Sequence, residues 1–297
     1  MKKNIAISSG GINSKVGKLL VNRLMPNRYI PKIGPFVFLD HLYPTEVKPQ
    51  ATVNPRSGEF AHPHRGIITF TYMFSGEMEH FDSKGNYGLV GAEGAQWMKS
   101  GNGIIHDEEP SPEMQKSGGH LHAVQFWINL PSAQKQEEGA YLALQSSDIP
   151  VLELPEQAGN LRLIIGKLGD KESPVIRYTE QFIYHIKLNP KSSFTLTVNP
   201  DLEYAAFVPQ KAVSINQVAY ENSQLVVFEQ GGDEIIFSND GIEQAELLVF
   251  GGERYTEPVE AEGPFVMNSR ADIAIAYRDF FNGKYGTIDY SIATAAV

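Results

Sequence analysis

The chain has 297 residues, enough for two domains of about 150 residues or for one large domain. Lysine and arginine number 25, and aspartate and glutamate number 35. The resulting net charge of −10 argues against nucleic acid or an anionic membrane surface as the main partner. Cysteine is absent, which excludes disulfides, thiolate catalysis and cysteine-ligated zinc or iron–sulfur centres. The apolar stretch Ile5–Ile7 is too short for a signal peptide, and no apolar run approaches a membrane span, so we expect a cytoplasmic protein.

Most of the chain consists of short segments rich in valine, isoleucine, phenylalanine, tyrosine and threonine, separated by glycine, asparagine, aspartate and proline. This texture is typical of an all-β sandwich or barrel and not of alternating strands and helices. The segments predicted as strands include Ile67–Phe74, His122–Leu130, Leu161–Gly166, Phe182–Leu188, Ser193–Val198, Gln224–Glu229 and Glu246–Phe250.

Helical periodicity is convincing only near the C-terminus. Ser269 offers an N-cap with Asp272 three residues later, and Gly283 can end the helix. The apolar residues at helical spacing, expected to dock on a barrel, are Ile273, Ala276, Tyr277, Phe280 and Phe281.

Prolines, glycines and runs of Gln and Glu between Leu130 and Leu161 indicate a region that joins two β domains. We therefore divide the chain into a first domain over 1–131, a linker region over 132–160 and a second domain over 161–297, which includes the terminal helix. The two halves have a similar texture, which two related barrels would explain.

The histidines are unevenly distributed, because seven of the eight precede residue 123. His62 and His64 stand at positions i and i+2, which in a strand puts both imidazoles on one face. His106 and Glu108 repeat that spacing with an imidazole and a carboxylate. Pairing the two segments would bring three imidazoles and a carboxylate to one point, a ligand set that suits a divalent transition metal.

Other histidines offer alternatives. His120 and His122 have the same spacing, and geometry alone does not exclude them as the second contributor. His80 stands near Glu77 and Glu79, which favours a solvated rim beside a turn. His185 lies among apolar residues and is expected to be a structural histidine in a sheet.

Several motifs resemble those of the pirin family, which belongs to the cupin superfamily. His-Pro-His-Arg-Gly at 62–66 and Gly-Asn-Gly-Ile-Ile-His-Asp-Glu at 101–108 are the most specific of them. Further matching segments are Gly34–His41, Gln96–Met98, His122–Pro131, Glu257–Val259 and Gly263–Asn268, so the resemblance covers nearly the whole chain.

The resemblance implies two packed cupin barrels with one mononuclear metal in the N-terminal barrel and no metal in the C-terminal one. Carried over position by position, the metal ligands are His62, His64, His106 and Glu108, so that His120 and His122 become pocket or structural residues. The chain departs from the broader cupin pattern at Ile68 and Thr69, where many cupins place a further ligand. Glu108 is therefore left to supply the carboxylate.

Pirin-like proteins are associated with two activities of different classes. In the first, an iron(II)-dependent dioxygenase opens flavonols such as quercetin with O₂, and Glu108 accepts the proton of the substrate hydroxyl as catalytic base. Ni, Co, Cu, Mn or Zn would fit the same ligands. In the second, the metal-loaded protein binds a regulatory partner protein without catalysis. We expect a monomer, and a flat pocket lined by aromatic residues drawn from Phe60, Tyr72, Phe74, Trp97 and Phe126.

Overall fold

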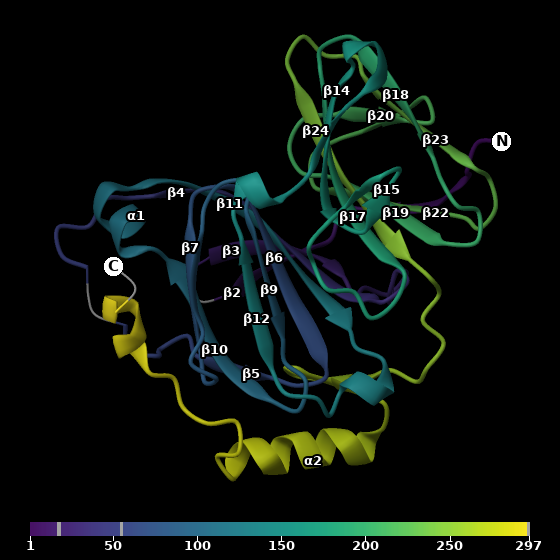
Figure 1. The fold of residues 1–297 in the computed structure, drawn as a ribbon. Helices are drawn as coiled ribbons and strands as arrows, with labels where there is room; N and C mark the ends of the chain where they lie inside the picture. The colour runs from purple at the N-terminus through teal and green to yellow at the C-terminus, as the bar shows by residue number, and fades with distance from the viewer. Residues whose placement is uncertain (17–18, 54–55, 296–297) are drawn as a thin grey trace. The chain divides into compact units, whose positions relative to one another are not determined.

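The computed structural model describes residues 1–16, 19–53 and 56–295 of the chain (Figure 1). Contacts divide the chain into two compact units, described separately below. The histidine unit comprises Lys15–Val21, Leu42–Ser147 and Thr256–Val297, and the second unit comprises Met1–Ser14, Asn22–His41 and Asp148–Tyr255. Most elements are strands, as predicted. Among the described residues, none of the helices has the length and apolar character needed to span a bilayer.

Two sheets make up most of the histidine unit in the described part of the chain, one of seven strands and one of four. The seven-stranded sheet has the order β12-β9-β6-β11-β4-β3-β2, and the division between units falls within β2, β3 and β4. Its strands are β12 (Ala140–Leu144), β9 (Ala95–Lys99), β6 (Ile67–Ser75), β11 (Gly119–Asn129), β4 (Phe36–Val47), β3 (Leu19–Met25) and β2 (Ile12–Val16). The four-stranded sheet consists of β5 (His62–His64), β10 (Ile104–Pro110), β7 (Met78–Asp82) and β8 (Tyr87–Val90).

Sheets of the same sizes occur in the described part of the second unit. The larger has the order β1 (Ile5–Ser9), β22 (Gln224–Phe228), β19 (Glu203–Val208), β24 (Ala245–Gly252), β17 (Gln181–Leu188), β14 (Gly159–Ile165) and β13 (Val151–Glu153). The smaller consists of β18 (Ser192–Thr197), β23 (Glu234–Asn239), β20 (Val213–Ile215) and β21 (Val218–Tyr220). Apolar side chains from both sheets, among them Leu163, Ile186, Phe237 and Val249, form one core cluster.

The described residues also form several short elements. Two-stranded sheets pair β15 (Lys167–Leu168) with β16 (Lys171–Glu172) and β25 (Glu260–Glu262) with β26 (Phe265–Met267). The 3₁₀ helices are η1 (Ser132–Gln134), η2 (Ser146–Asp148), η3 (Pro155–Gln157) and η4 (Tyr290–Ala295). A short helix that we did not predict, α1 (Pro112–Ser117), begins where the Ser111 hydroxyl accepts a hydrogen bond from the Met114 N–H.

The predicted C-terminal helix is α2 (Arg270–Phe281), and the Ser269 side chain caps it by accepting from the Asp272 N–H. Ile273 and Ala276 are buried in a cluster with residues of β26, as the predicted stripe requires. Phe281 is 78% exposed, so including it in the buried stripe was wrong. It stands eight residues after Ile273, which at 100° per residue puts it at the margin of the apolar face.

The region over 132–160 contains more structure than a linker. β12 pairs with β9 in the histidine unit, and β13 pairs with β14 in the second unit. The contact-based units also differ from the sequence-based boundaries at 131 and 161, which stay a prediction. The differences arise because β1 pairs with β22 of the second unit, whereas α2 packs on β26 of the histidine unit.

Candidate metal centre

β10 is the strand that organises the centre, because it lies between β5 and β7 in the four-stranded sheet. On one side His62 pairs with His106 across antiparallel strands, and on the other side Glu108 pairs with His80. Pro63 occupies the middle of β5, an edge strand of three residues, where a missing N–H donor is tolerated. Within each strand, every second side chain points to the same face, and the pairing of the strands brings these side chains together.

The imidazoles of His62, His64 and His106 converge. The Nε2 atoms of His62 and His106 are 3.0 Å apart, and the ring centroids of the three residues are separated by 4.4–5.0 Å. One ring nitrogen from each residue lies within 4.8 Å of the corresponding atoms of the other two. Spacings of this size allow three ligands to reach one transition-metal ion at about 2.1 Å from each nitrogen.

Backbone carbonyls fix the orientation of two of these rings. His62 Nδ1 donates to the carbonyl oxygen of Phe60 at 2.8 Å, and His64 Nδ1 donates to that of Pro264 at 3.1 Å. An imidazole whose Nδ1 carries the proton presents a lone pair on Nε2 in its neutral form, so these hydrogen bonds leave Nε2 as the ligand atom of both rings. The Nε2 atom of His64 is buried and has no hydrogen-bond partner, which is costly unless a further group binds there. These residues fit a divalent transition metal.

Burial also controls the protonation of the centre. Desolvation, together with the neighbouring imidazoles, lowers the pKa of His64 and of His106 well below the usual value of 6.5. Both rings are therefore neutral at neutral pH, which is the form that binds metal.

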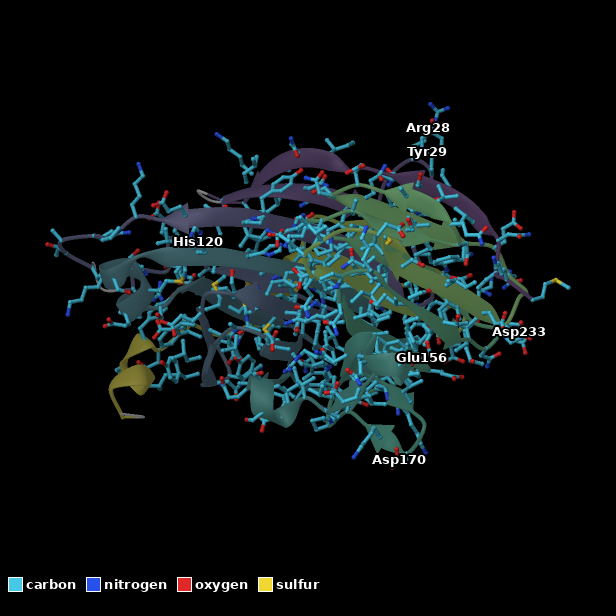
Figure 2. The ribbon with its side chains drawn as sticks, turned by 90° about the horizontal axis from the view of Figure 1, so that it is seen from above. Arg28, Tyr29, His120, Glu156, Asp170 and Asp233 are labelled. Atoms are coloured by element: carbon cyan, nitrogen blue, oxygen red, sulfur yellow. The ribbon has the colours of Figure 1, made fainter. Side chains whose placement is uncertain are left out.

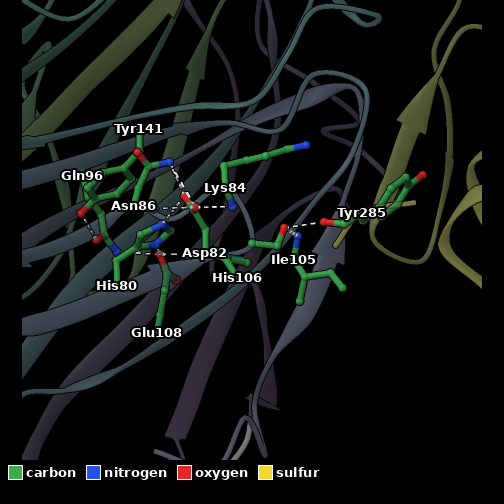
Figure 3. Close-up of polar contacts among 11 residues, drawn as sticks. His80, Asp82, Lys84, Asn86, Gln96, Ile105, His106, Glu108, Tyr141 and Tyr285 are labelled. Carbon is green, nitrogen blue, oxygen red and sulfur yellow. Dashed lines mark hydrogen bonds and ion pairs between the residues drawn. The ribbon is translucent and has the colours of Figure 1, made fainter. Parts of the chain in front are cut away.

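Glu108 lies beside the three imidazoles but does not join their group. Its Oε1 atom is 3.7 Å from His106 Nδ1 and 3.9 Å from His80 Nδ1. Glu108 therefore contacts the Nδ1 atom of His106, whereas the Nε2 atom of that ring contacts His62. Its carboxylate accepts a hydrogen bond from Gln96 Nε2 at 2.5 Å (Figure 3). It accepts a second one from Gln125 Nε2 at 2.9 Å. The expectation that Glu108 is a metal ligand remains a prediction.

His80 belongs to the centre, and its interpretation as part of a solvated rim was wrong. The side chain is fully buried, stacks on Tyr141 at 4.1 Å, and contacts Asp82 through Nε2 at 3.1 Å (Figure 3). Desolvation lowers the pKa of His80, but Asp82 and Glu108 outweigh it and raise the pKa above its usual value. The alternation of His80 and Asp82 was the available signal, because it matches that of His106 and Glu108.

The remaining histidines lie elsewhere. His120, labelled in Figure 2, is exposed, and His122 stacks on Phe74 with ring centroids 4.4 Å apart. Neither is in the group formed by His62, His64 and His106. His185 is buried in β17, with Nε2 3.0 Å from Glu246, consistent with a structural role.

The predicted aromatic pocket is largely wrong. On β6, β9 and β11, Thr71 pairs with Gln96 and Gln125, whose amides reach Glu108, so this face lines the centre. Phe70 pairs with Trp97 and Phe126 on the opposite face. Tyr72 and Phe74 lie two and four residues after Phe70 in β6, so their side chains also face away from the centre.

One aromatic residue that sequence reasoning missed does reach the centre. Trp127 pairs with Thr69, on the same face of the sheet as Thr71, and its ring is 5.0 Å from that of His64 in an edge-on arrangement. The side chain is half-buried, so part of the indole is accessible beside the imidazoles.

Comparison with known proteins agrees with this architecture. The family model Pirin matches residues 18–128, which include the three converging histidines and Glu108, and the model Pirin C-terminal cupin domain matches residues 183–286. The chain belongs to the pirin family. Its two domains are therefore cupin-like, as the sequence motifs implied.

Among relatives of this pirin, Pirin-1 of Arabidopsis thaliana is 36% identical over 229 residues, covering 76% of this chain and 77% of that protein. A crystal structure described as quercetin 2,3-dioxygenase from Acinetobacter baumannii superposes with a TM-score of 0.89 at 32% identity, covering 97% of this chain and all of that one. A bacterial pirin from Escherichia coli in complex with nickel(II) has a TM-score of 0.61 at 18% identity, over 82% and 96% of the two chains. That last likeness shows the fold alone.

Proposed function

We propose that this pirin is a mononuclear metal dioxygenase that opens flavonols such as quercetin with O₂. The observation that carries the proposal is the convergence of three imidazoles, two of which have Nε2 turned away from the backbone carbonyl that holds Nδ1. The relative from Acinetobacter baumannii, described as a quercetin 2,3-dioxygenase, supports the choice of substrate class.

His62, His64 and His106 would hold the ion through one nitrogen each, with iron(II) as the metal we favour and Ni, Co, Cu, Mn or Zn as alternatives. When bound, the metal supplies Lewis acidity toward the substrate oxygens and redox chemistry toward O₂. Three protein ligands leave coordination positions for substrate, which is typical of catalytic and not of structural metal sites.

Glu108 would act as the base in this reaction. The carboxylate lies 3.7 Å from His106 and is half-buried, so a flavonol oriented at the imidazoles would present its hydroxyl near Oε1 or Oε2. Either oxygen can accept the hydroxyl proton, which leaves the substrate as the electron-rich anion that reacts with O₂.

Trp127 would orient the substrate. Its half-buried indole packs against His64 and offers an apolar surface to a planar aromatic ligand. Stacking on this surface would place the flavonol ring system beside the imidazoles and restrict access of water to the reacting face.

The test is single-turnover chemistry with the full chain. Protein is loaded anaerobically with one equivalent of Fe(II), mixed with quercetin and exposed to ¹⁸O₂. We expect loss of the flavonol absorbance and a ring-opened product that carries both labelled oxygen atoms. Glu108→Gln should reduce the rate about 10²–10⁴-fold, the usual contribution of a general base, and the exposed His120→Ala is the matched control that retains activity.

Intact flavonol after stoichiometric iron loading would contradict the proposal. If the metal-loaded chain then captured a protein partner that the metal-free chain did not, the regulatory role predicted as the alternative would replace it. The monomeric state and the cytoplasmic location stay predictions, which size-exclusion chromatography and cell fractionation check.

A further inference from the structure

Both oxygens of the Glu108 carboxylate are held by side-chain amides from the opposite sheet. Gln96 of β9 donates to Oε1 at 2.5 Å, and Gln125 of β11 donates to Oε2 at 2.9 Å. Hydrogen bonds to an ionised carboxylate are about twice as strong as those between neutral groups. The two amides therefore fix where this carboxylate rests.

Further side chains set the direction in which the amides point. Tyr141 of β12 donates its hydroxyl to Gln96 Oε1 at 3.1 Å, and the Gln125 Nε2 atom also donates to Thr71 Oγ1 at 3.1 Å. An ionised carboxylate only accepts hydrogen bonds, so both amides must present their NH₂ groups to Glu108. Side chains from four strands of the seven-stranded sheet, β6, β9, β11 and β12, thus form the hydrogen-bond network that holds the Glu108 carboxylate.

The resting position is not that of a ligand shared with the three imidazoles. Glu108 is absent from the group formed by His62, His64 and His106. It instead forms a group with His80 and with the Nδ1 atom of His106. To bind an ion at the three Nε2 atoms, the carboxylate would have to move and to weaken its hydrogen bonds to the amides.

We infer that Gln96 and Gln125 are positioning residues that hold Glu108 off the metal and set the balance between two positions of its carboxylate, amide-bound and metal-bound. This inference rests on the metal site proposed above. In the amide-bound position Glu108 leaves one more coordination position for substrate and stays available as a proton acceptor. In the metal-bound position it closes that coordination position.

The test compares the metal affinity of the full chain and the double variant Gln96→Met and Gln125→Met, which keeps unbranched side chains of similar length and removes both donors. Released from the amides, Glu108 should bind the ion more often. We expect Co(II) to bind about tenfold more tightly, within the range of effects that groups behind metal ligands exert. The visible Co(II) spectrum should change because a carboxylate joins the ligands.

Adding Glu108→Gln to the double variant should abolish the gain in affinity, since the gain comes from that carboxylate. Tyr141→Phe, which removes only the hydroxyl that orients Gln96, should give a smaller change in the same direction. It also serves as the test if the double variant does not fold. Tyr87→Phe is the matched control, because its hydroxyl contacts Glu79 and not this network.

Weaker or unchanged Co(II) binding in the double variant would overturn the inference, as would tighter binding that persists without Glu108. For Tyr141→Phe, an unchanged or weaker affinity overturns it in the same way. These measurements do not depend on flavonol turnover. A chain that binds Co(II) as expected but leaves quercetin intact would refute the proposed reaction and leave this inference standing.

Discussion

The β5–β10 pair of the histidine unit and the β18–β23 pair of the second unit are both antiparallel and both begin a four-stranded sheet. In the first pair His62 lies opposite His106. In the second, Phe194 lies opposite Phe237, and Leu196 lies opposite Ile235.

The energetics of the two pairs differ in kind. The apolar side chains of β18 and β23 belong to or pack against a large core cluster, and each buried one stabilises its unit by roughly 1.5–3 kcal/mol. His64 of β5 and His106 of β10 are buried too, but each has a ring nitrogen without a hydrogen-bond partner, and a buried polar group without a partner costs stability. The same strand pairing thus buries apolar core residues in one unit and gathers the candidate metal ligands in the other.

Removing an imidazole should give the largest effect. We expect His64→Ala and His106→Ala each to abolish stoichiometric metal binding, because two remaining nitrogens hold a divalent ion weakly. Metal analysis after dialysis checks this, with His120→Ala as control. Full metal content in His64→Ala would contradict the assignment of the metal site to the β5–β10 pair.

Truncating a buried core residue of β23 in the second unit should change stability alone. Phe237 is fully buried in the core cluster, so Phe237→Ala should lower the free energy of unfolding by about 3–5 kcal/mol. Urea denaturation measures the loss, and metal content per folded chain should stay the same. Loss of metal at unchanged stability would show that the second unit contributes to the centre.

Lys135 provides a smaller effect inside the histidine unit. Its buried Nζ donates to the carbonyls of Gly66 and Val266 at 2.8 Å and to Asn129 Oδ1 at 2.5 Å. Lys135→Met should destabilise the protein by about 1–3 kcal/mol, because these buried acceptors lose their donor. Thermal unfolding tests it, and an unchanged or raised midpoint would count against the role of this ammonium group.

The smallest predicted effect is a dependence on pH. Because burial lowers the pKa of His64 and His106 in the folded chain, the unfolded chain binds more protons below about pH 6.5. In the metal-free protein, the stability that these two imidazoles contribute is thus present above that pH and is lost as the pH falls. His64→Ala should show a shallower decline between pH 7 and 5 in thermal melts, and an equal or steeper decline contradicts the assignment.

Metal content should respond to the same protons. Since protons compete with the ion for imidazole nitrogens, we expect loaded protein to lose metal as the pH falls below about 6. A metal content that stays constant down to pH 4.5 in equilibrium dialysis would contradict it.

Part of this account follows from local sequence patterns. Alternation along a strand places His62 with His64 and His106 with Glu108, because successive side chains in a strand point to opposite faces. The capped helix at 270–281 was predicted from Ser269 and Asp272 for an equally local reason.

The rest depends on register between distant strands. Gln96 and Trp97 are neighbours in the chain and necessarily face opposite ways, but only the pairing of β9 with β6 decides that the amide and not the indole faces Glu108. His80 was likewise assigned to a rim because nothing local shows that β7 lies beside β10.

The most direct test of the central claim is anomalous scattering from a crystal of the metal-loaded full chain, measured on both sides of the absorption edge of the metal. We predict one anomalous peak at the Nε2 atoms of His62, His64 and His106, and no such peak between β18 and β23. A peak elsewhere in the molecule, or none at the three imidazoles after stoichiometric loading, would contradict the account.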